Sequence, residues 1–319
     1  MVSQVSVQAG SGGSARSAWG VLREVAGDIK LAHSVFALPF AILGAFLAGG
    51  GGYPGVRGFL LQLALIIPCM VFARTWAMLF NRIADRRFDA ENPRTLRRAL
   101  AAGRLSIGQA WGAALGSAAL FVAAAALFGV FFGNWWPASL SVPVLAWIAF
   151  YSLTKRFTVL CHLFLGGALA ASPLAAAIAV NPSTVLGWPP PQLSIYLLAG
   201  MVLCWVAGFD VIYALQDIEY DRSRGLSSIP ARLGWRSAAW VSRALHALAV
   251  AFLVLAWLGH GQLGAIFGAG VGLVVALLLA EHLVLARRGK AGLDMAFFTL
   301  NGVVSLVLGL AGCIDVVVN

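Results

Sequence analysis

Long apolar stretches separated by short polar segments make up most of the chain from residue 32 onward. Nine of them have the length of roughly 20 residues that an α-helix needs to cross a bilayer; they cover 32–51, 58–80, 107–130, 135–153, 158–180, 193–216, 237–258, 263–286 and 294–317. Membrane β-strands would instead alternate in hydrophobicity over about ten residues. The pattern predicts an all-α integral membrane protein, a bundle of about nine transmembrane helices.

The first residues do not follow this pattern. Residues 1–18 are rich in Ser, Gly and Ala and lack the apolar core of a signal peptide, so we expect a disordered N-terminal tail. The short connections between the apolar stretches leave room for one membrane-embedded domain, predicted over 19–319.

Composition agrees with a membrane protein, and charge distribution predicts its orientation. The chain is 61% hydrophobic and 11% charged, whereas soluble domains carry about 25% charged residues. Twenty of its 22 Lys and Arg residues fall on one side: in the N-terminal segment, in alternate connections or, for Arg243, at the adjoining end of a stretch. Arg57 is on the other side and Arg74 is deep inside a stretch. Basic loops stay in the cytoplasm. We therefore expect the N-terminus on the cytoplasmic side of a bacterial inner membrane, and no nucleic-acid partner despite the net charge of +10.

Acidic residues are rare, yet they gather at the ends of the second and sixth stretches. Two series share steps of seven and four residues: Arg74, Asn81 and Asp85 in the first cluster, and Asp210, Asp217 and Asp221 in the second. Asp89 extends the first series by four more. Residues at such helical intervals share a face, and both stretches end on the cytoplasmic side. We expect the two series to face each other across one cavity.

Carboxylates four residues apart repel each other and need a cation between them. Mg²⁺ is bound in proteins by one or two carboxylates together with water and phosphate oxygens, so two facing series can hold two Mg²⁺ ions and a diphosphate. Asp210 and Arg74 lie at membrane depth, where a charge costs about 2.5–3.5 kcal/mol and indicates function; Arg74 could instead pair with Asp210. In the structural alternative, the acids form solvated ion pairs with neighbouring arginines, which contribute little.

Three motifs carry a family resemblance. Asn81-x-x-x-Asp85-x-x-x-Asp89, followed by Asn92-Pro93-Arg94-Thr95 and Arg98, closely resembles the first aspartate-rich motif of the UbiA superfamily of intramembrane prenyltransferases. The segment from Tyr213 to Asp221 resembles its second motif, and Tyr151-Ser152-Leu153-Thr154-Lys155 resembles its Tyr-x-x-x-Lys element. The resemblance covers residues 25–317 and implies a central cavity that opens near the cytoplasmic side.

The resemblance also implies a role for each matching residue. Metal ions would be held by Asp85, Asp89, Asp217 and Asp221, with help from Asn81. Arg94, Arg98 and Lys155 would lie near the diphosphate, and Arg156 would meet a carboxylate of the acceptor. Tyr213 would lie near the reacting carbon. Independently of the resemblance, the position of Arg74 and Asp210 at membrane depth predicts that both contact substrate.

The implied reaction is Mg²⁺-dependent transfer of a polyprenyl group from polyprenyl diphosphate to a small aromatic acid, 4-hydroxybenzoate or a related precursor of ubiquinone or menaquinone. Two departures leave the acceptor open: Arg98-Ala99-Leu100 stands where Arg-Pro-Leu is frequent, and Asn81-Arg82 where many 4-hydroxybenzoate enzymes have Asn-Asp. The Asn81-Arg82 and Asn92-Pro93-Arg94-Thr95 forms, with Ser228-Ile229-Pro230-Ala231-Arg232 downstream, look nearer to the 4-hydroxybenzoate-like branch that includes menaquinone enzymes of the futalosine route. No obligate protein partner is evident.

Three alternatives remain. A haem O synthase-type farnesyltransferase shares the first motif but matches the second less well. A cation-coupled transporter would also place charges at membrane depth, yet its polar path would have to continue to the far side, and the apolar stretches offer almost none. A membrane scaffold would leave the facing acids without a purpose.

The remaining reactive residue types carry less signal. His33 and His162 each begin an apolar stretch, where capping or interfacial packing is the favoured interpretation, and no histidine pair has the spacing of zinc or haem ligands. The four cysteines are isolated within apolar stretches and predict no disulfide framework.

Overall fold

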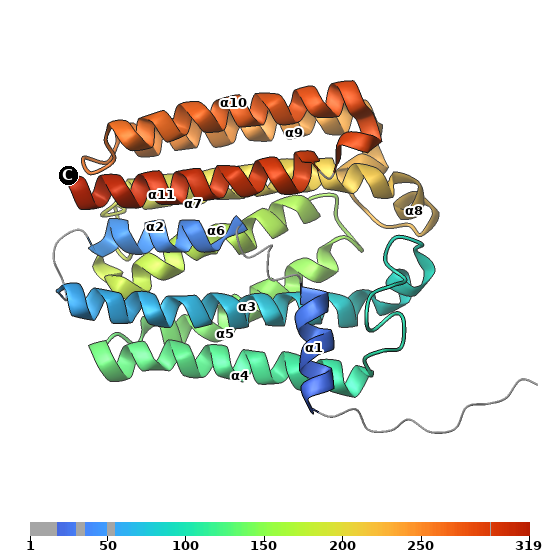
Figure 1. Cartoon of the computed structure of the whole chain (residues 1–319), viewed down its shortest axis with the longest axis horizontal. Coiled ribbons are helices and arrows are strands. Elements are labelled where there is room, and N and C mark those ends of the chain that lie inside the picture. Colours follow the sequence, from blue (N-terminus) through green and yellow to red (C-terminus); the bar gives the residue numbers. More distant parts are fainter. Residues whose placement is uncertain (1–17, 30–35, 50–54, 294) are drawn as a thin grey trace, which may run out of the picture.

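The computed structural model describes residues 18–29, 36–49, 55–293 and 295–319, and this part of the chain is helical and contains no strand (Figure 1). Its α-helices are α1 (Ala18–Ile29), α2 (Leu38–Gly49), α3 (Val56–Glu91), α4 (Ile107–Phe132), α5 (Trp136–Thr154), α6 (Cys161–Val180), α7 (Leu193–Ala214), α8 (Ile218–Ser223), α9 (Ile229–Leu258), α10 (Ala265–Arg288) and α11 (Asn301–Val318). Short 3₁₀ turns η2 (Pro182–Thr184), η3 (Leu215–Asp217) and η4 (Gly289–Gly292) and a π-helix η5 (Met295–Leu300) connect some of them. The predicted tail, apart from Ala18, lies outside the described residues.

The described residues form eight helices that are long and apolar enough to span a membrane, together with the shorter apolar helix α2. The all-α prediction is confirmed. The first predicted stretch, 32–51, lies partly outside the described residues, and its described part forms the 12-residue helix α2.

Local signals explain several helix ends. Helix α4 starts at a capping box, in which the Ser106 hydroxyl accepts from the Gln109 N–H while the Gln109 side chain accepts from the Ser106 N–H. Gly133 ends it in the left-handed conformation at φ 69°. Ser228 caps α9 by accepting from the Ala231 N–H, and Gly234 kinks this helix at φ 77°.

Helix α7 is the central element of the bundle, and α6 and α9 pack along it. The α6–α7 approach is close because a side chain at Gly166 would lie 2.3 Å from the carbonyl oxygen of Leu203. At Gly44 of α2, a side chain would lie 2.4 Å from the Pro173 carbonyl oxygen of α6. Small residues permit such close contact in membrane bundles. Helix α6 therefore packs closely against both α2 and α7 and forms one wall of the cavity.

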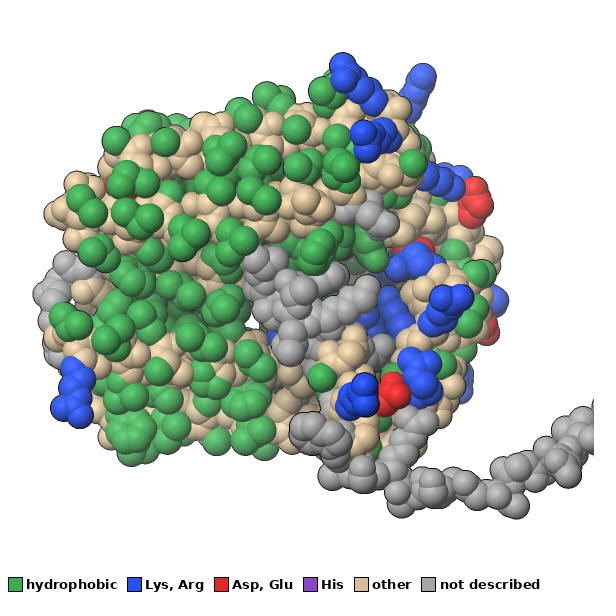
Figure 2. All heavy atoms as spheres, viewed as in Figure 1, with side chains coloured by type: hydrophobic (Ala, Val, Ile, Leu, Met, Phe, Trp, Pro, Cys, Tyr) green, Lys and Arg blue, Asp and Glu red, His purple; other side chains and the backbone are tan. Residues whose placement is uncertain are grey.

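The two ends of the bundle differ in charge. Figure 2 shows hydrophobic side chains over the flank and basic side chains concentrated at the end where α8 lies in Figure 1. Helix α3 runs eleven residues past the predicted end at 80, as far as Glu91. The first acidic cluster therefore continues the helix at this basic end, as its spacing requires.

Candidate active site

One cavity of about 1070 Å³ lies between α3, α5, α6 and α7. Twelve residues singled out from the sequence line it: Arg74, Asn81, Asp85, Asp89, Arg94, Arg98, Lys155, Arg156, Asp210, Tyr213, Asp217 and Asp221. Farther from the acids its wall is apolar, with Phe128, Leu140, Leu169 and Ile178 among the lining residues. The cavity thus combines a charged mouth with an apolar interior.

The first acidic cluster lies on the uninterrupted helix α3. The Asn81 side chain donates to Asp85 Oδ2 at 3.2 Å, one helical turn away, so the predicted common face is formed. Asp89 is buried, and Thr95 anchors the following loop by donating to the Asp89 carbonyl oxygen at 3.1 Å.

The second cluster is not on one α-helix, which corrects the prediction that helical intervals run through it. Helix α7 ends at Ala214, and the 3₁₀ turn η3 separates it from α8. The Gln216 side chain donates to the Tyr213 carbonyl oxygen at 2.8 Å and supports this break. Asp217 and Asp221 are buried on either side of the junction between η3 and α8 and still line the same cavity.

Each of the four carboxylates pairs with a different basic side chain. The N–O distances are 3.2 Å for Arg156–Asp85, 2.6 Å for Arg98–Asp89, 2.7 Å for Arg94–Asp217 and 2.7 Å for Lys155–Asp221. Arg94 binds Asp217 through both Nε and Nη2 and also donates to the Tyr213 hydroxyl at 3.1 Å. This bidentate geometry is the stronger form of the interaction.

Two of these cations lie in the connections between the spans. Burial lowers the pKa of Arg94, but the Asp217 carboxylate more than offsets this, so the net shift is upward. For Lys155, burial likewise lowers the pKa, and the Asp221 carboxylate again reverses the shift, so that the pKa is raised. Both side chains therefore remain cationic beside the acids at neutral pH.

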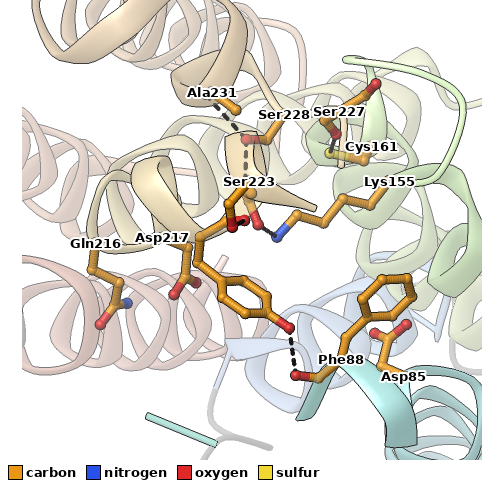
Figure 3. A network of polar contacts seen from close by, with 12 residues as sticks. Asp85, Phe88, Lys155, Cys161, Gln216, Asp217, Ser223, Ser227, Ser228 and Ala231 are labelled. Carbon is orange, nitrogen blue, oxygen red and sulfur yellow. Dashed lines mark hydrogen bonds and ion pairs between the residues drawn. The ribbon is translucent and has the colours of Figure 1, made fainter. Parts of the chain in front are cut away.

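A hydrogen bond joins the two acidic clusters directly. The Tyr220 hydroxyl on α8 donates to the Phe88 carbonyl oxygen on α3 at 2.6 Å, as the phenol and carbonyl in Figure 3 show. Lys155 and Ser228, both labelled in Figure 3, each end at a dashed line; their partner is Asp221, whose Oδ1 lies 2.7 Å from Lys155 Nζ and whose Oδ2 accepts from Ser228 at 3.0 Å. Tyr220 and Ser228 lie inside or beside the motifs, but their spacing gave no indication of these contacts.

Two further contacts were not anticipated from the sequence. Arg156, expected to meet an acceptor carboxylate, contacts Asp85 and donates to the Ala84 carbonyl oxygen at 2.8 Å. Asp210 contacts His162, with Nδ1 and Oδ2 2.6 Å apart. His162 is buried, as expected for a packing residue, and it also lines the cavity, so its role extends beyond capping or interfacial packing. His33 lies outside the described residues.

An aromatic wall closes one side of the cavity. Phe297, on the π-helix η5, stacks against Tyr213 with ring centroids 4.1 Å apart. The Asn301 side chain donates to the Ala296 carbonyl oxygen at 2.8 Å and accepts from the buried Trp205 indole at 2.6 Å. π-Helical turns are frequent at functional sites, and this one presents Phe297 to the cavity.

The donor chemistry at the charged mouth fits a hard divalent cation. The side-chain atoms available at the mouth are carboxylate and amide oxygens, which Mg²⁺ prefers as ligands. Asp221 Oδ1 is buried and accepts no hydrogen bond with good geometry, although Lys155 Nζ lies 2.7 Å away. Among the described residues, no three His, Cys, Asp or Glu side chains converge on one point.

Comparison with known proteins gives a consistent family. The model of the UbiA prenyltransferase family matches residues 37–303. A 4-hydroxybenzoate octaprenyltransferase from Azotobacter vinelandii is 30% identical over 275 residues, 85% of this chain and 85% of that protein. A protein of the same name from Xanthomonas oryzae pv. oryzae is 34% identical over 237 residues, 74% of each chain.

Solved structures agree with the fold. The apo structure of a UbiA homolog from Aeropyrum pernix K1 has a TM-score of 0.78 and 34% sequence identity, covering 90% of this chain and 98% of that one. A UbiA homolog from Archaeoglobus fulgidus, bound to GPP and Mg²⁺, has a TM-score of 0.66 over 92% of this chain and 99% of that one. At 18% identity this second structure supports the fold alone.

Proposed function

The chain belongs to the UbiA prenyltransferase family, and on that premise we propose that it transfers a polyprenyl group from polyprenyl diphosphate to 4-hydroxybenzoate or a related aromatic acid that is a quinone precursor. Relatives named 4-hydroxybenzoate octaprenyltransferase match most of its length. We propose Mg²⁺ as the cofactor, because a homolog was solved with GPP and Mg²⁺ and the oxygen ligands here suit that ion.

One observation carries the proposal: four acids and four basic side chains surround the mouth of a single cavity whose deeper wall is apolar. A polyprenyl diphosphate has the same division into a highly charged head and an apolar chain. A transport path would instead need polar residues throughout the bundle.

In the proposed reaction, Asp85, Asp89, Asp217 and Asp221, assisted by Asn81, hold Mg²⁺, which when bound neutralises charge on the departing diphosphate. Arg94, Arg98 and Lys155 stabilise the same developing charge by turning from their carboxylates to phosphate oxygens. The allylic carbon–oxygen bond breaks, and diphosphate keeps its electron pair. The aromatic ring forms the new carbon–carbon bond and then loses a proton.

Apolar and aromatic walls protect the reacting carbon. Tyr213 and Phe297 lie beside the charged mouth, where ring faces stabilise a cation. The buried interior excludes the water that would otherwise quench the allylic cation. Arg74 and Arg156, both in the cavity lining, are the proposed contacts for the acceptor carboxylate.

To test the proposal, purified protein in detergent is supplied with Mg²⁺, a polyprenyl diphosphate and a panel of hydroxybenzoates and hydroxynaphthoates. We expect a prenylated aromatic product that disappears with EDTA and falls sharply in Asp85→Asn and Asp217→Asn. A wild-type protein that prenylates none of these acceptors contradicts the proposed substrate class, and activity that survives both substitutions contradicts the proposed metal site. Prenylation of a haem acceptor alone would favour the haem O synthase alternative.

We also propose that the charged end of the bundle faces the bacterial cytoplasm. The basic side chains concentrate there, as in Figure 2, and Lys and Arg are retained on the cytoplasmic side. The C-terminus lies at the opposite end in Figure 1. Alkaline phosphatase fused after Asn319 should therefore be active in the periplasm, whereas an active fusion after Lys290 would contradict this orientation.

A further inference from the structure

A second set of polar side chains, which we call the polar level, lines the cavity deeper than the acidic mouth. Arg74 precedes Asn81 by seven residues on α3, and Asp210 precedes Asp217 by seven on α7 and η3, which places both side chains roughly 10 Å deeper along their helices. Tyr151 of α5 and His162 of α6 also line the cavity. Charged groups at this depth are costly unless they are paired or used.

Asp210 and His162 form the best-defined pair of this level. His162 is 2% exposed, and its Nδ1 lies 2.6 Å from Asp210 Oδ2. The other ring nitrogen, Nε2, accepts from the Ile229 N–H at 3.4 Å. Nδ1 therefore donates its hydrogen to the carboxylate, which fixes the Asp210 rotamer.

The contact with His162 leaves the other Asp210 carboxylate oxygen, Oδ1, as a hydrogen-bond acceptor. The Asp210 side chain is 23% exposed and lines the cavity, while the histidine engages Oδ2. A carboxylate with one oxygen held and the other accessible accepts a hydrogen from an O–H group. The Asp210 carboxylate repels another carboxylate. The part of the polar level beside Asp210 therefore favours the hydroxyl group of an acceptor over its acid group.

We propose that Asp210, oriented by His162, accepts the hydroxyl hydrogen of a hydroxylated aromatic acceptor; this rests on the proposed prenyl transfer and adds a specificity-determining contact to it. The depth agrees, because a ring that attacks the carbon next to the diphosphate must lie below the mouth and not within it. A hydrogen bond from the hydroxyl to a carboxylate also increases electron density in the ring, which favours attack on an allylic cation. Asp210 is thus the substrate contact, and His162 is a positioning residue.

The first test compares two acceptors that differ at the hydroxyl. The acceptor that gives most product in the panel is compared with its O-methyl ether, which cannot donate a hydrogen bond, and affinities are measured as KM and as the inhibition constant. For wild-type protein we expect the hydroxylated compound to bind about 10- to 100-fold more tightly, as a hydrogen bond to a charged group implies. Equal affinities would overturn the inference without any variant.

The second test uses Asp210→Asn. We expect the acceptor KM to rise about tenfold or more, whereas the KM for polyprenyl diphosphate should stay within twofold. The ratio of the affinities for the hydroxylated acceptor and its methyl ether should approach one. A purely structural role for Asp210 would leave that preference intact. His162→Phe should raise the acceptor KM by about fivefold, and His162→Gln, which can still donate to Asp210, should restore most of the loss.

Glu281 provides a matched control. It is a fully buried acid on α10 that accepts from Asn301 at 3.2 Å, and it is not among the residues that line the cavity. Glu281→Gln should change neither KM. An active wild-type protein whose Asp210→Asn variant keeps its acceptor KM and its hydroxyl preference overturns this inference alone. A wild-type protein with no transfer to any hydroxylated aromatic overturns the proposed function and the inference together.

Discussion

The two acidic clusters share their spacing in the sequence but differ in backbone and burial. On α3 the helix is continuous, and the Asp85 side chain remains 29% exposed beside Arg156. Beyond α7 the helix breaks at η3, and the Asp221 side chain is completely buried between Lys155 and Ser228. Equal spacing therefore does not produce equal sites: one cluster is held by helix geometry, and the other by tertiary contacts.

This contrast has an energetic consequence. A partly exposed pair such as Arg156–Asp85 contributes at most about 1 kcal/mol because water already solvates both partners. A fully buried carboxylate has lost that solvation and depends on its partners for compensation. Substitutions at Asp221 or its partner Lys155 should therefore affect folding as well as chemistry, whereas those at Asp85 or its partner Arg156 should affect chemistry with little effect on folding.

The largest effect is expected for the buried acid itself. Asp221→Asn should lower kcat about 100- to 1000-fold, the range for removing one electrostatic stabiliser, in a prenyl-transfer assay at saturating Mg²⁺. Glu219→Gln is the matched control, because Glu219 is an exposed acid on the same short helix; it should stay within twofold of wild type. If Asp221→Asn retains more than a tenth of wild-type activity, the buried Lys155–Asp221 pair has a structural role and not a catalytic one.

Next in size is the loss of stability when a cation is removed. Lys155→Met leaves Asp221 buried without its ion pair and should destabilise the protein by about 3 kcal/mol, the lower end for a broken buried pair, because the Lys155 side chain is itself 35% exposed. Arg156→Met should cost less than about 1 kcal/mol. Thermal unfolding in detergent measures both, and equal shifts would remove the distinction between the clusters.

A smaller effect is expected for the bond that joins the clusters. Tyr220→Phe removes the hydrogen bond to Phe88 and should cost about 1 kcal/mol, which corresponds to roughly a fivefold higher Mg²⁺ concentration for half-maximal activity. Tyr196→Phe is the control, because Tyr196 donates a 2.7 Å hydrogen bond to Val185 away from the acids. If both variants require the same Mg²⁺ concentration as wild type, the bond does not set the distance between the clusters.

The smallest effect concerns pH. The raised pKa of Lys155 means that its stabilising contribution is fully present below the unfolded-state pKa of about 10.4 and is lost only as pH rises through the higher folded-state value. The difference in unfolding temperature between wild type and Lys155→Met should therefore stay constant from about pH 7 to pH 9. A difference that shrinks by half over this range would mean that the lysine loses its proton there.

Much of the architecture follows from the sequence because membrane helices are long and uniformly apolar. The helix positions and the assembly of both clusters at one cavity follow from stretch length, spacing and the alternation of charge. The break at η3 does not, because residues 193–216 contain no proline and read as one stretch; it depends on the Gln216 side chain and on packing.

The pairing of charges in the site was also beyond sequence reasoning. Motif spacing placed Asp210 and Arg74 at the same depth, which suggested that they pair with each other. The preference of Asp210 for His162 depends on how close α6 lies to α7, and that distance is set by the close packing at Gly166. Which partner an acid selects is decided by such three-dimensional contacts, not by intervals along one helix.

The π-helix at Met295–Leu300 makes the cavity wall depend on the number of residues as well as on their identity. A π turn accommodates one residue more than an α turn, and each residue of an α-helix rotates the chain by about 100°. Deleting one residue from this segment would let it relax to an α-helix and swing Phe297 away from Tyr213, even though no side chain in the wall had been exchanged. In this part of the molecule, chain length itself acts as a determinant of the active-site shape.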